Sequence, residues 1–534
     1  MDRRLESLAR LFTIRLVALT MAAVLAATGC RGAAVAPPGP AAEEPQKEKE
    51  EAVEVKEQAW NPFVVVEPGG RIFVTYYGGR GGSEYGLLFT RSLDGGLTWL
   101  PEPVELDTKV PRGQRFGFHR LETNGHGRVS VTWVIEQKEE IYWRARQVRN
   151  RQSSDSGTTW SQEVLRRPFL QQGNYPTAAT GRDGAFHLLW MEGPSSRPVP
   201  RFIRTTDAGL TWAPEPVTLP GVEAADGTQR KKERFAFRDA AWPVLALGPR
   251  DALYAIWQEA LLGASVGSGT DILFNRSEDG GRTWLESSLR LNTPFSTPTH
   301  TSRIPVAAVT EEGHLYVVWE DFRHGTSDLY FNRSLDGGAT WLAEDVWLTA
   351  VRPPQASATD PILSADRSGR LYLLWTDIRD APFSLYFTRS LDRGATWLSK
   401  PIRIDRHGPK EIAYAPRLAH DEAGHVYATW WEGPEATKGS IRFRRSEDFG
   451  ATWLNNEQIL DAGQGKDGPR FPQLSAEGQG GVYIVWSSDR TGRYQLYANR
   501  SMDHGKTWLP KDVQITGIPA SRQGKSAATT VTDK

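Results

Sequence analysis

The chain has 534 residues, of which 64 are basic and 64 acidic, so its formal net charge at neutral pH is zero. This balance argues against a general nucleic-acid binder or a protein held on a membrane surface by charge. The single cysteine, Cys30, excludes intramolecular disulfides and cysteine metal sites. The 51 glycines and 20 tryptophans are typical of many strands and tight turns, and no long amphipathic helical pattern follows residue 30.

Residues 1–30 have the pattern of a bacterial lipoprotein signal peptide. Arginines at the start precede an apolar run from Leu16 to Ala27. The segment Ala27-Thr28-Gly29-Cys30 resembles a lipobox, which implies that Cys30 is lipidated after cleavage. An ordinary signal peptide or an uncleaved anchor is the alternative.

Residues 31–58 are rich in Ala, Pro, Glu and Lys, a composition that cannot bury a core and predicts a flexible tether. Arg31 follows the cysteine where an aspartate would indicate inner-membrane retention. By resemblance to that sorting pattern, we expect a lipid-anchored protein of the cell envelope, at the outer membrane. Residues 518–534 form a polar tail.

Between these ends, at residues 59–517, one short motif recurs eight times. Ser or Thr stands two residues before an aspartate, with Gly two, Thr four and Trp five residues after it. The carboxylate can accept backbone N–H bonds within a turn, and glycine supplies a positive φ without strain, so each copy predicts a hairpin turn. The aspartates are Asp94, Asp155, Asp207, Asp279, Asp336, Asp392, Asp448 and Asp503.

A second pattern accompanies the motif. In seven units a proline stands 14 residues before an aromatic residue, as in Pro305 and Trp319, and the remaining unit has His119 and Trp133 at that spacing. Two apolar strands lie between these positions, a third leads into the aspartate turn and a fourth follows it. The repeat therefore predicts an all-β fold, a β-propeller of eight four-stranded blades.

The motif resembles the Asp-box (BNR) repeat of sialidases and related propellers. That repeat is found in enzymes and non-enzymes alike, so function has to be argued from the site. In a four-stranded meander the aspartate turns lie on one face, and the starts of the first strands lie on the other. Loop expansions in blades 2 to 4 fall on this second face, and the longest, between Trp212 and Pro243, carries a basic and aromatic segment (Arg230, Lys231, Lys232, Arg234, Phe235, Phe237 and Arg238).

Blade 5 most resembles a sialidase, through Arg303-Ile304-Pro305, Asp321-Phe322-Arg323 and Asp328. In that family arginines bind the sialic acid carboxylate, a tyrosine activated by a glutamate is the nucleophile, and an aspartate is the acid. The resemblance implies that Tyr414, Asp328 and Glu432 are catalytic. It implies that Arg303, Arg323, Arg470 and Arg490 bind the substrate.

Other interpretations stay open at this point. The recurring acids and arginines can instead pair with one another as a structural ladder within or between blades. The two functional hypotheses are a sialidase-like protein that binds or hydrolyses an acidic glycan, and a non-catalytic scaffold that holds a cell-envelope protein through the expanded loops. We expect no cofactor and no metal site, because the aspartate turns lack dense oxygen ligands and the ten histidines show no pair at metal spacing.

Overall fold

The computed structural model describes residues 58–516, apart from short gaps. The gaps are residues 82–83, 108–109, 111–112, 124, 140–141, 162–164, 182–183, 193–198, 206–211, 222–242, 261–268, 294–300, 351–355, 380–382, 435–438, 463–464 and 466. The predicted signal peptide, the predicted tether except Gln58, the predicted polar tail and most of the longest loop expansion therefore lie outside the described residues.

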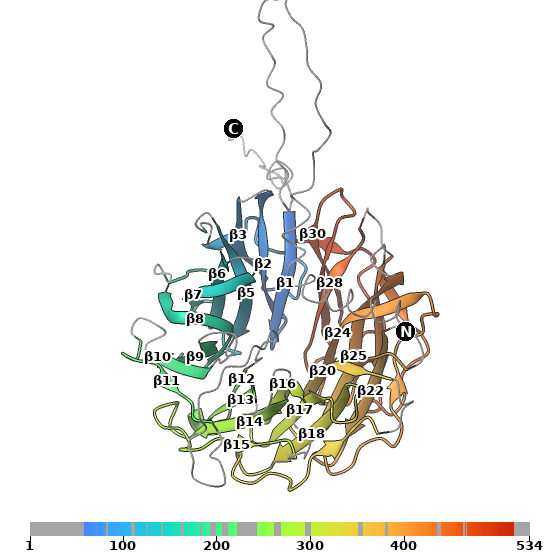
Figure 1. Cartoon of the computed structure of the whole chain (residues 1–534). Helices are drawn as coiled ribbons and strands as arrows, with labels where there is room; N and C mark the ends of the chain where they lie inside the picture. The colour runs from blue at the N-terminus through green and yellow to red at the C-terminus, as the bar shows by residue number, and fades with distance from the viewer. Residues whose placement is uncertain are drawn as a thin grey trace, which may run out of the picture.

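The predicted all-β propeller of eight four-stranded antiparallel blades is confirmed (Figure 1). Blades 1 to 3 comprise β1 (Gln58–Glu67), β2 (Arg71–Gly81), β3 (Glu84–Ser92), β4 (Val104–Asp107), β5 (Gln114–Thr123), β6 (Val129–Glu139), β7 (Tyr142–Ser153), β8 (Leu165–Thr180), β9 (Phe186–Glu192), β10 (Val199–Thr205) and β11 (Val217–Thr218). Blades 4 to 6 comprise β12 (Val244–Leu247), β13 (Leu253–Ala260), β14 (Thr270–Ser277), β15 (Leu289–Arg290), β16 (Ser302–Val309), β17 (Leu315–Asp321), β18 (Asp328–Ser334), β19 (Val346–Trp347), β20 (Ala358–Ala365), β21 (Leu371–Asp377), β22 (Ser384–Ser390) and β23 (Ile402–Arg403).

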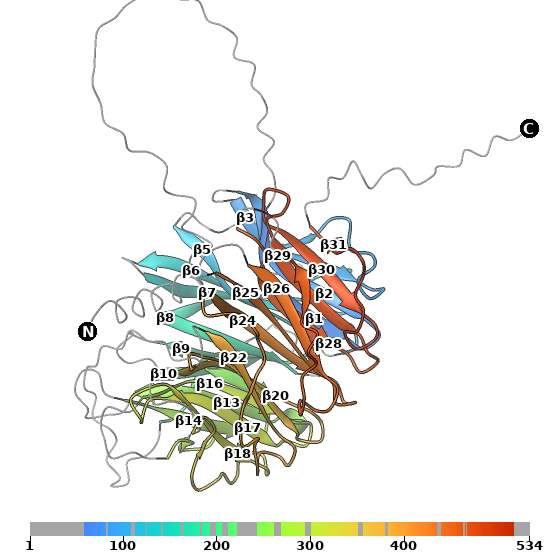
Figure 2. The same ribbon diagram turned by 90° about the vertical axis from the view of Figure 1, so that its right-hand side faces the viewer.

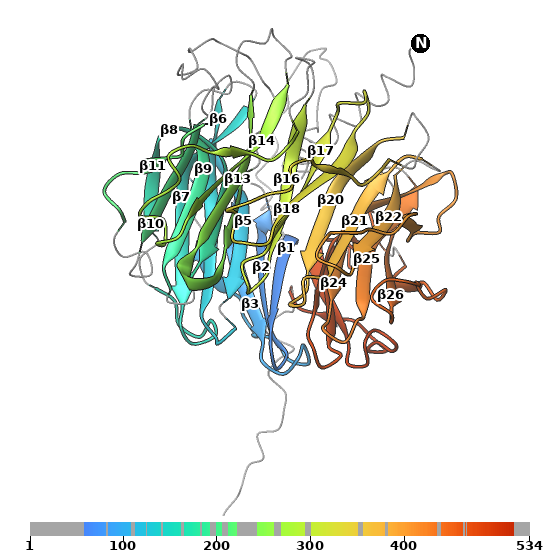
Figure 3. The same ribbon diagram turned by 90° about the horizontal axis from the view of Figure 1, so that it is seen from below.

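Blades 7 and 8 comprise β24 (Glu411–His420), β25 (Val426–Pro434), β26 (Ser440–Ser446), β27 (Gln458–Asp461), β28 (Arg470–Ala476), β29 (Val482–Ser488), β30 (Gln495–Ser501) and β31 (Val513–Gln514). The view from below shows blades 4 to 7 following one another in chain order, from green to orange (Figure 3). In the described part of the chain the helical structure is one 3₁₀ turn, Pro249–Asp251, and no helix there is long and apolar enough to cross a bilayer.

Blades 2 and 3 share a strand. The first half of β8 pairs with β7, and its second half pairs with β9, so the two blades form one seven-stranded sheet. The change of partner occurs at Gly173, which is paired with Ala145 on one side and Glu192 on the other. One long strand thus ends blade 2 and begins blade 3.

The first strand of each blade is innermost and contacts the first strands of both neighbouring blades, in the closed order β1, β5, β8, β12, β16, β20, β24, β28 and back to β1. Figure 2 shows blade 8, in red, beside blade 1, in blue. Side chains of both blades, among them Val74 and Val485, pack in one apolar cluster. The ring is therefore closed by packing between two blades that each consist of consecutive strands.

The seven described copies of the repeated motif, which we call aspartate turns, have the same internal hydrogen bonds. In blade 1 the Ser92 hydroxyl donates to Asp94 Oδ1 (2.7 Å) and accepts the Gly96 N–H (2.7 Å), and the Thr98 hydroxyl donates to Asp94 Oδ2 (2.5 Å). Burial alone would raise the pKa of Asp94, but the bonds from Thr98 and Ser92 lower it to about 2. Each aspartate thus holds its turn as an ionised acceptor.

The tryptophan that ends an aspartate turn packs edge-on against a phenylalanine on the third strand of the preceding blade. This pair recurs at six junctions with ring centroids 4.8 to 5.1 Å apart, as in Phe331 and Trp397. The turn glycine faces the same ring, and a Cβ at Gly394 would lie 2.5 Å from Phe331. Gly and Trp therefore recur in the motif because both pack against the phenylalanine ring of the preceding blade.

An arginine two residues after that phenylalanine reaches the aspartate turn of the next blade. Arg389 donates to the carbonyls of Asp448 and Phe449, both at 2.8 Å, and Arg276 donates to the carbonyl of Gly337 (2.8 Å). In the last blade Arg500 donates to the carbonyl of Asp94 (3.2 Å), which belongs to the first blade. The arginine that precedes the motif is thus an interblade contact.

Candidate functional site

The first strands carry a repeated bulge near their starts, on the face opposite the aspartate turns. In five blades the residue before the strand-1 proline has φ between 51° and 54°, an uncommon value for a residue other than glycine, and the strand register shifts there. In each of these blades the residue two before the proline lies directly before the bulge, at the equivalent position of the first strand. We call this set the strand-1 rim, and its members are Trp60, Arg303, Thr359, Tyr414 and Arg470.

Three predicted site residues, Arg303, Tyr414 and Arg470, therefore share one repeat position on the innermost strands. Arg303 is already engaged, since its Nε donates to Glu320 Oε2 (3.1 Å) and its guanidinium stacks on the Phe322 ring at 4.5 Å. Glu320 is fully buried and also accepts the hydroxyl of Thr359 in the next blade (2.6 Å). Arg303 thus contributes to a link between blades 5 and 6.

Tyr414 is the most exposed of the predicted catalytic residues, with 37% of its surface accessible. Its neighbour Arg417 donates to the Pro416 carbonyl (2.8 Å) and to Gln473 Oε1 of blade 8 (3.3 Å). Burial lowers the pKa of Arg417, and the nearby Tyr414 opposes that shift. A partly buried guanidinium that donates only to uncharged groups in the described residues thus lies beside the exposed tyrosine.

Arg470 begins β28 and is half-buried. Within the described residues it forms no ion pair, and its electrostatic neighbour is Tyr494, whose pKa burial raises to about 12 while Arg470 opposes the rise. The carboxylates of Asp467 and Asp489 also act on Tyr494, and Asp489 accepts the backbone N–H groups of Asp467 (2.8 Å) and Gly468 (2.9 Å). Arg470 is the rim cation best placed to meet an external anion.

Arg323 and Arg490 are engaged in ion pairs inside the fold. Arg323 bonds both Asp321 (2.8 Å) and Asp345 (2.7 Å) and lies on the Tyr330 ring at 3.9 Å. Burial pushes the pKa of Arg323 down, but the two carboxylates raise it above its ordinary value.

Arg490 is held in the same way, by Asp512 (2.8 Å), by Asp461 (3.3 Å) and by the ring of Tyr497 at 3.7 Å. Arg323 and Arg490 thus pair with acids of the fold, which is the structural alternative that the sequence left open. Asp345, the second partner of Arg323, follows it by 22 residues in the sequence, after the aspartate turn of the same blade.

Glu432 and Tyr414 lie on opposite faces of their sheet. Tyr414 pairs with Trp431, and Glu432 pairs with Ala413, so the alternation of side chains points the two away from each other. Glu432 instead accepts the Trp430 indole N–H (2.9 Å), and burial raises its pKa. The catalytic role of Glu432 stays a prediction, and in this geometry it does not activate Tyr414.

This use of the acid two residues after the strand-2 tryptophan recurs around the ring. The indoles of Trp257, Trp319 and Trp375 donate to Glu259, Asp321 and Asp377 at 3.1 to 3.3 Å. In blades 2 and 8 the acceptor comes from the preceding blade, as Asp107 for Trp133 and Asp461 for Trp486, both at 2.8 Å. A buried indole N–H needs such an acceptor, which explains the acid.

Asp328, the predicted acid, lies at the start of β18 and is buried. Its Oδ1 accepts the hydroxyl of Thr349 (2.8 Å), and its Oδ2 lies 3.5 Å from His324 Nδ1. The structure therefore brings Arg303, Tyr414 and Arg470 to the strand-1 rim. The other four predicted residues lie in hydrogen-bond and ion-pair networks inside the fold, namely Asp328, Glu432, Arg323 and Arg490. The basic segment Arg230 to Arg238 lies outside the described residues.

On the other face, the structure assembles a group that sequence patterns did not reveal. His425 Nδ1 and His504 Nδ1 lie 2.9 and 3.0 Å from Asp421 Oδ2. Asp421 and His504 are 83 residues apart, on two neighbouring blades, so no local spacing links them. Only the blade alignment could have indicated this, since both histidines occupy turn positions next to the blade junction.

No family model matches the chain. A stretch of 135 residues is 28% identical to Uncharacterized protein MT1551 of Mycobacterium tuberculosis (strain CDC 1551 / Oshkosh), covering 23% of this chain and 44% of that protein. The chain thus spans less than half the length of this curated relative.

Several solved structures are similar in part. A PL25 ulvan lyase has a TM-score of 0.44 at 11% identity, covering 83% of this chain and 94% of the lyase. Hadza microbial sialidase Hz136 has a TM-score of 0.34 at 17% identity (60% and 67% covered), and the alpha-L-arabinofuranosidase Arb93a from Fusarium graminearum has 0.37 at 15% (62% and 93%). The propeller assignment follows from this chain's own strand pairing, independently of these matches.

Proposed function

We propose that the protein binds an acidic glycan at the strand-1 rim, through Arg470 and Tyr414. The observation that carries this proposal is Arg470 itself, a half-buried cation on an innermost strand that forms no ion pair among the described residues. A guanidinium suits a sugar carboxylate, since it can donate two parallel hydrogen bonds. The exposed Tyr414, at the same repeat position one blade away, offers a ring and a hydroxyl to a saccharide.

The geometry supports binding better than hydrolysis. A sialidase-like reaction would need several free arginines and a glutamate beside the tyrosine. Arg323 and Arg490 are held by carboxylates, and Glu432 lies on the opposite face of the sheet from Tyr414. Sialidase and ulvan lyase are among the similar structures, so acidic saccharides are suitable probes.

Membrane attachment is a separate part of the proposal, and the motif at Cys30 supports it. Lipidation of Cys30 would hold the propeller at the cell envelope, on the outer membrane, with residues 31–58 as the tether. Replacing Cys30→Ser should move the protein from the membrane fraction to the soluble fraction. Retention of the variant in the membrane fraction would contradict lipid anchoring.

The binding test compares Arg470→Ala with the purified full-length protein, using sialyllactose and a glucuronic acid oligosaccharide as ligands and lactose as the neutral control. We expect binding of an acidic ligand by calorimetry and at least a roughly tenfold weaker affinity in the variant, about 1.4 kcal/mol. Arg367→Ala is the matched control, because Arg367 is 74% exposed on the aspartate-turn face. Its affinity should equal that of the wild type.

Hydrolysis is tested with a fluorogenic sialic acid glycoside across pH 4 to 8, and we expect no turnover. Turnover that disappears in Tyr414→Phe would establish a sialidase instead. If no acidic saccharide binds, the alternative scaffold hypothesis, with a protein partner held by the loops of blades 2 to 4, replaces this proposal.

A further inference from the structure

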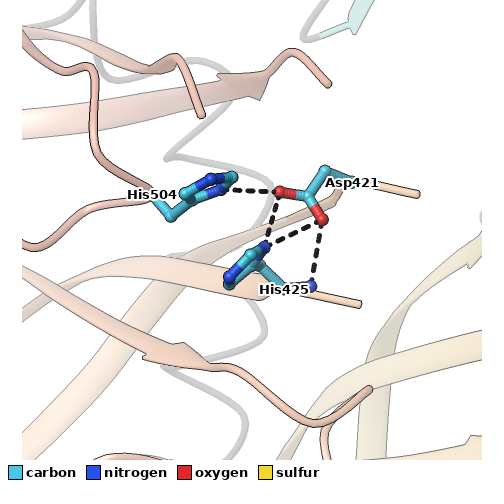
Figure 4. A group of neighbouring side chains, drawn as sticks. All are labelled: Asp421, His425 and His504. Atoms are coloured by element: carbon cyan, nitrogen blue, oxygen red, sulfur yellow. Dashed lines mark hydrogen bonds and ion pairs between the residues drawn. The ribbon is translucent and has the colours of Figure 1, made fainter. Parts of the chain in front are cut away.

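The group of Asp421, His425 and His504 lies on the aspartate-turn face, at the junction between blades 7 and 8 (Figure 4). Asp421 and His425 belong to the turn between β24 and β25. His504 is the residue after the aspartate of the blade 8 turn, between β30 and β31. The group is thus on the opposite face from the strand-1 rim, and it joins two blades.

The three side chains converge on one point. Both Nδ1 atoms face Asp421 Oδ2, at 2.9 and 3.0 Å, and the two imidazole rings are stacked with centroids 3.9 Å apart (Figure 4). The three possible ligand atoms all lie within 4.8 Å of one another. In a tetrahedral zinc site with bonds near 2.1 Å, neighbouring ligand atoms are roughly 3.4 Å apart, so a cation fits with small shifts.

The carboxylate is held in place by its own surroundings. Asp421 is buried, and its Oδ1 accepts the backbone N–H groups of Ala423 and His425, both at 3.0 Å. The buried Tyr427 hydroxyl donates to Oδ2 (2.9 Å). Hydrogen bonds of this kind orient the first ligands of protein metal sites.

In two other blades the position equivalent to His425 carries a permanent cation. In blade 6 the buried Asp366 is neutralised by Arg370, four residues later, at 2.5 Å. Blade 1 has Glu67 and Arg71 at the same spacing, at 2.8 Å. In blade 7 the arginine position holds His425, so among the described residues the buried Asp421 faces two imidazoles and no Lys or Arg.

The opposing residue differs as well. At the junction between blades 6 and 7, Arg370 stacks on the ring of Phe449 at 4.2 Å. Phe449 and His504 occupy the same position, directly after the aspartate of their turns. The junction between blades 7 and 8 therefore has two histidines where the junction between blades 6 and 7 has an arginine and a phenylalanine.

We propose that Asp421, His425 and His504 bind a divalent first-row transition-metal ion of the zinc class, which ties blade 7 to blade 8. Two imidazoles and one carboxylate oxygen suit such ions, whereas calcium and magnesium require more oxygen ligands. The histidine side chains are 17% and 28% exposed, which leaves access for the ion and for a water as fourth ligand. The ion takes the place of the fixed arginine charge of blade 6.

The test uses the full-length protein without a histidine tag, stripped with EDTA and titrated with Zn²⁺ against a chromophoric chelator. We expect one equivalent to bind, and a Tm increase of roughly 3 °C at saturating metal. His425→Gln and His504→Gln should each weaken binding at least tenfold. Co²⁺ should give visible absorption bands of a tetrahedral site that both variants lose.

Two further variants keep the result interpretable. His314→Gln is the control, because His314 holds the same turn position in blade 5 beside Glu312 (3.4 Å), and the opposing position, directly after Asp392, holds Arg393. The double variant His425→Arg with His504→Phe recreates the chemistry of the junction between blades 6 and 7. It should fold, lose the zinc site and show no metal-dependent Tm change.

Three outcomes would overturn the proposal. They are zinc binding that persists in the double variant, an equal loss of binding in His314→Gln, and a wild-type protein that takes up no Zn²⁺ or Co²⁺. Ca²⁺ and Mg²⁺ serve as a fourth arm, and tighter binding of either than of Zn²⁺ at this group would contradict the stated metal class.

Discussion

Two neighbouring junctions of the ring, between blades 7 and 8 and between blades 8 and 1, use the same repeat positions differently. Between blades 7 and 8, Phe443 packs edge-on against Trp508 with centroids 4.9 Å apart. Between blades 8 and 1 the phenylalanine position holds Ala498, and a cavity of about 10 Å³ lies beside Trp99 and Ala498. The closing junction, where no chain segment leads from one blade to the next, is thus the less tightly packed of the two.

Polar contacts also join the two blades at the closing junction. Arg500 reaches the carbonyl of Asp94, and Glu477 Oε2 accepts the Gly70 N–H (3.1 Å) while its Oε1 accepts the Tyr483 hydroxyl (2.8 Å). Hydrogen bonds of this kind contribute about 1 kcal/mol each, less than a buried aromatic ring. The repeat thus fixes the backbone, while single substitutions decide how firmly each pair of blades is joined.

The largest effect is expected when the tighter junction is made to resemble the looser one. Phe443→Ala removes a buried ring and should lower the free energy of unfolding by about 3 kcal/mol or more. Guanidinium unfolding followed by tryptophan fluorescence measures it. Leu509→Ala, a truncation beside the cavity of the closing junction, serves as the comparison and should cost less than Phe443→Ala, so an equal or larger cost would contradict the difference in packing.

At a third junction, between blades 1 and 2, the contribution of a buried histidine to stability depends on pH. His119 is buried edge-on against Tyr77, with centroids 4.7 Å apart, and burial lowers its pKa to about 4. Since this is below the unfolded value near 6.5, the neutral ring contributes its full stability above pH 6.5 and loses it as the pH falls toward 4. The loss should reach about 3 kcal/mol.

The measurement compares the unfolding free energy of the wild type and His119→Leu at pH 7 and pH 4. The wild type should lose about 3 kcal/mol more than the variant over this interval, whatever the variant's stability at pH 7. Equal losses would show that His119 is not the group responsible.

The smallest effect is expected from filling the looser junction. Ala498→Phe restores the residue type found at this position in six other blades and should raise the free energy of unfolding by about 1 kcal/mol. Hydrogen exchange should slow in β1 and β30 but not in β21. A lower stability would mean that Ile72 and Trp99 have closed over the space that phenylalanine occupies elsewhere.

The repeat made the fold predictable, because eight copies of the aspartate turn and of the proline-to-aromatic spacing define the strands of each blade. The strand-1 rim could also be predicted from the sequence, because Arg303, Tyr414 and Arg470 each stand two residues before a proline. The facing of Glu432 away from Tyr414 depends on a bulge at Ala415, and the sequence does not show bulges. The partner of Arg323 and the pairing of His425 with His504 depend on contacts between distant segments, which blade packing alone brings together.

Because blade 1 and blade 8 each consist of consecutive strands, the points where the described chain enters and leaves the ring carry no topological role. A circularly permuted protein, with residue 516 joined to residue 58 by a linker, could therefore be opened between any two blades whose connecting loop is free to be cut. The boundary between blades 2 and 3 is different, since β8 belongs to both, and cutting there would divide a continuous strand. The shared strand thus makes blades 2 and 3 a single unit of rearrangement in a ring whose other blades are modular.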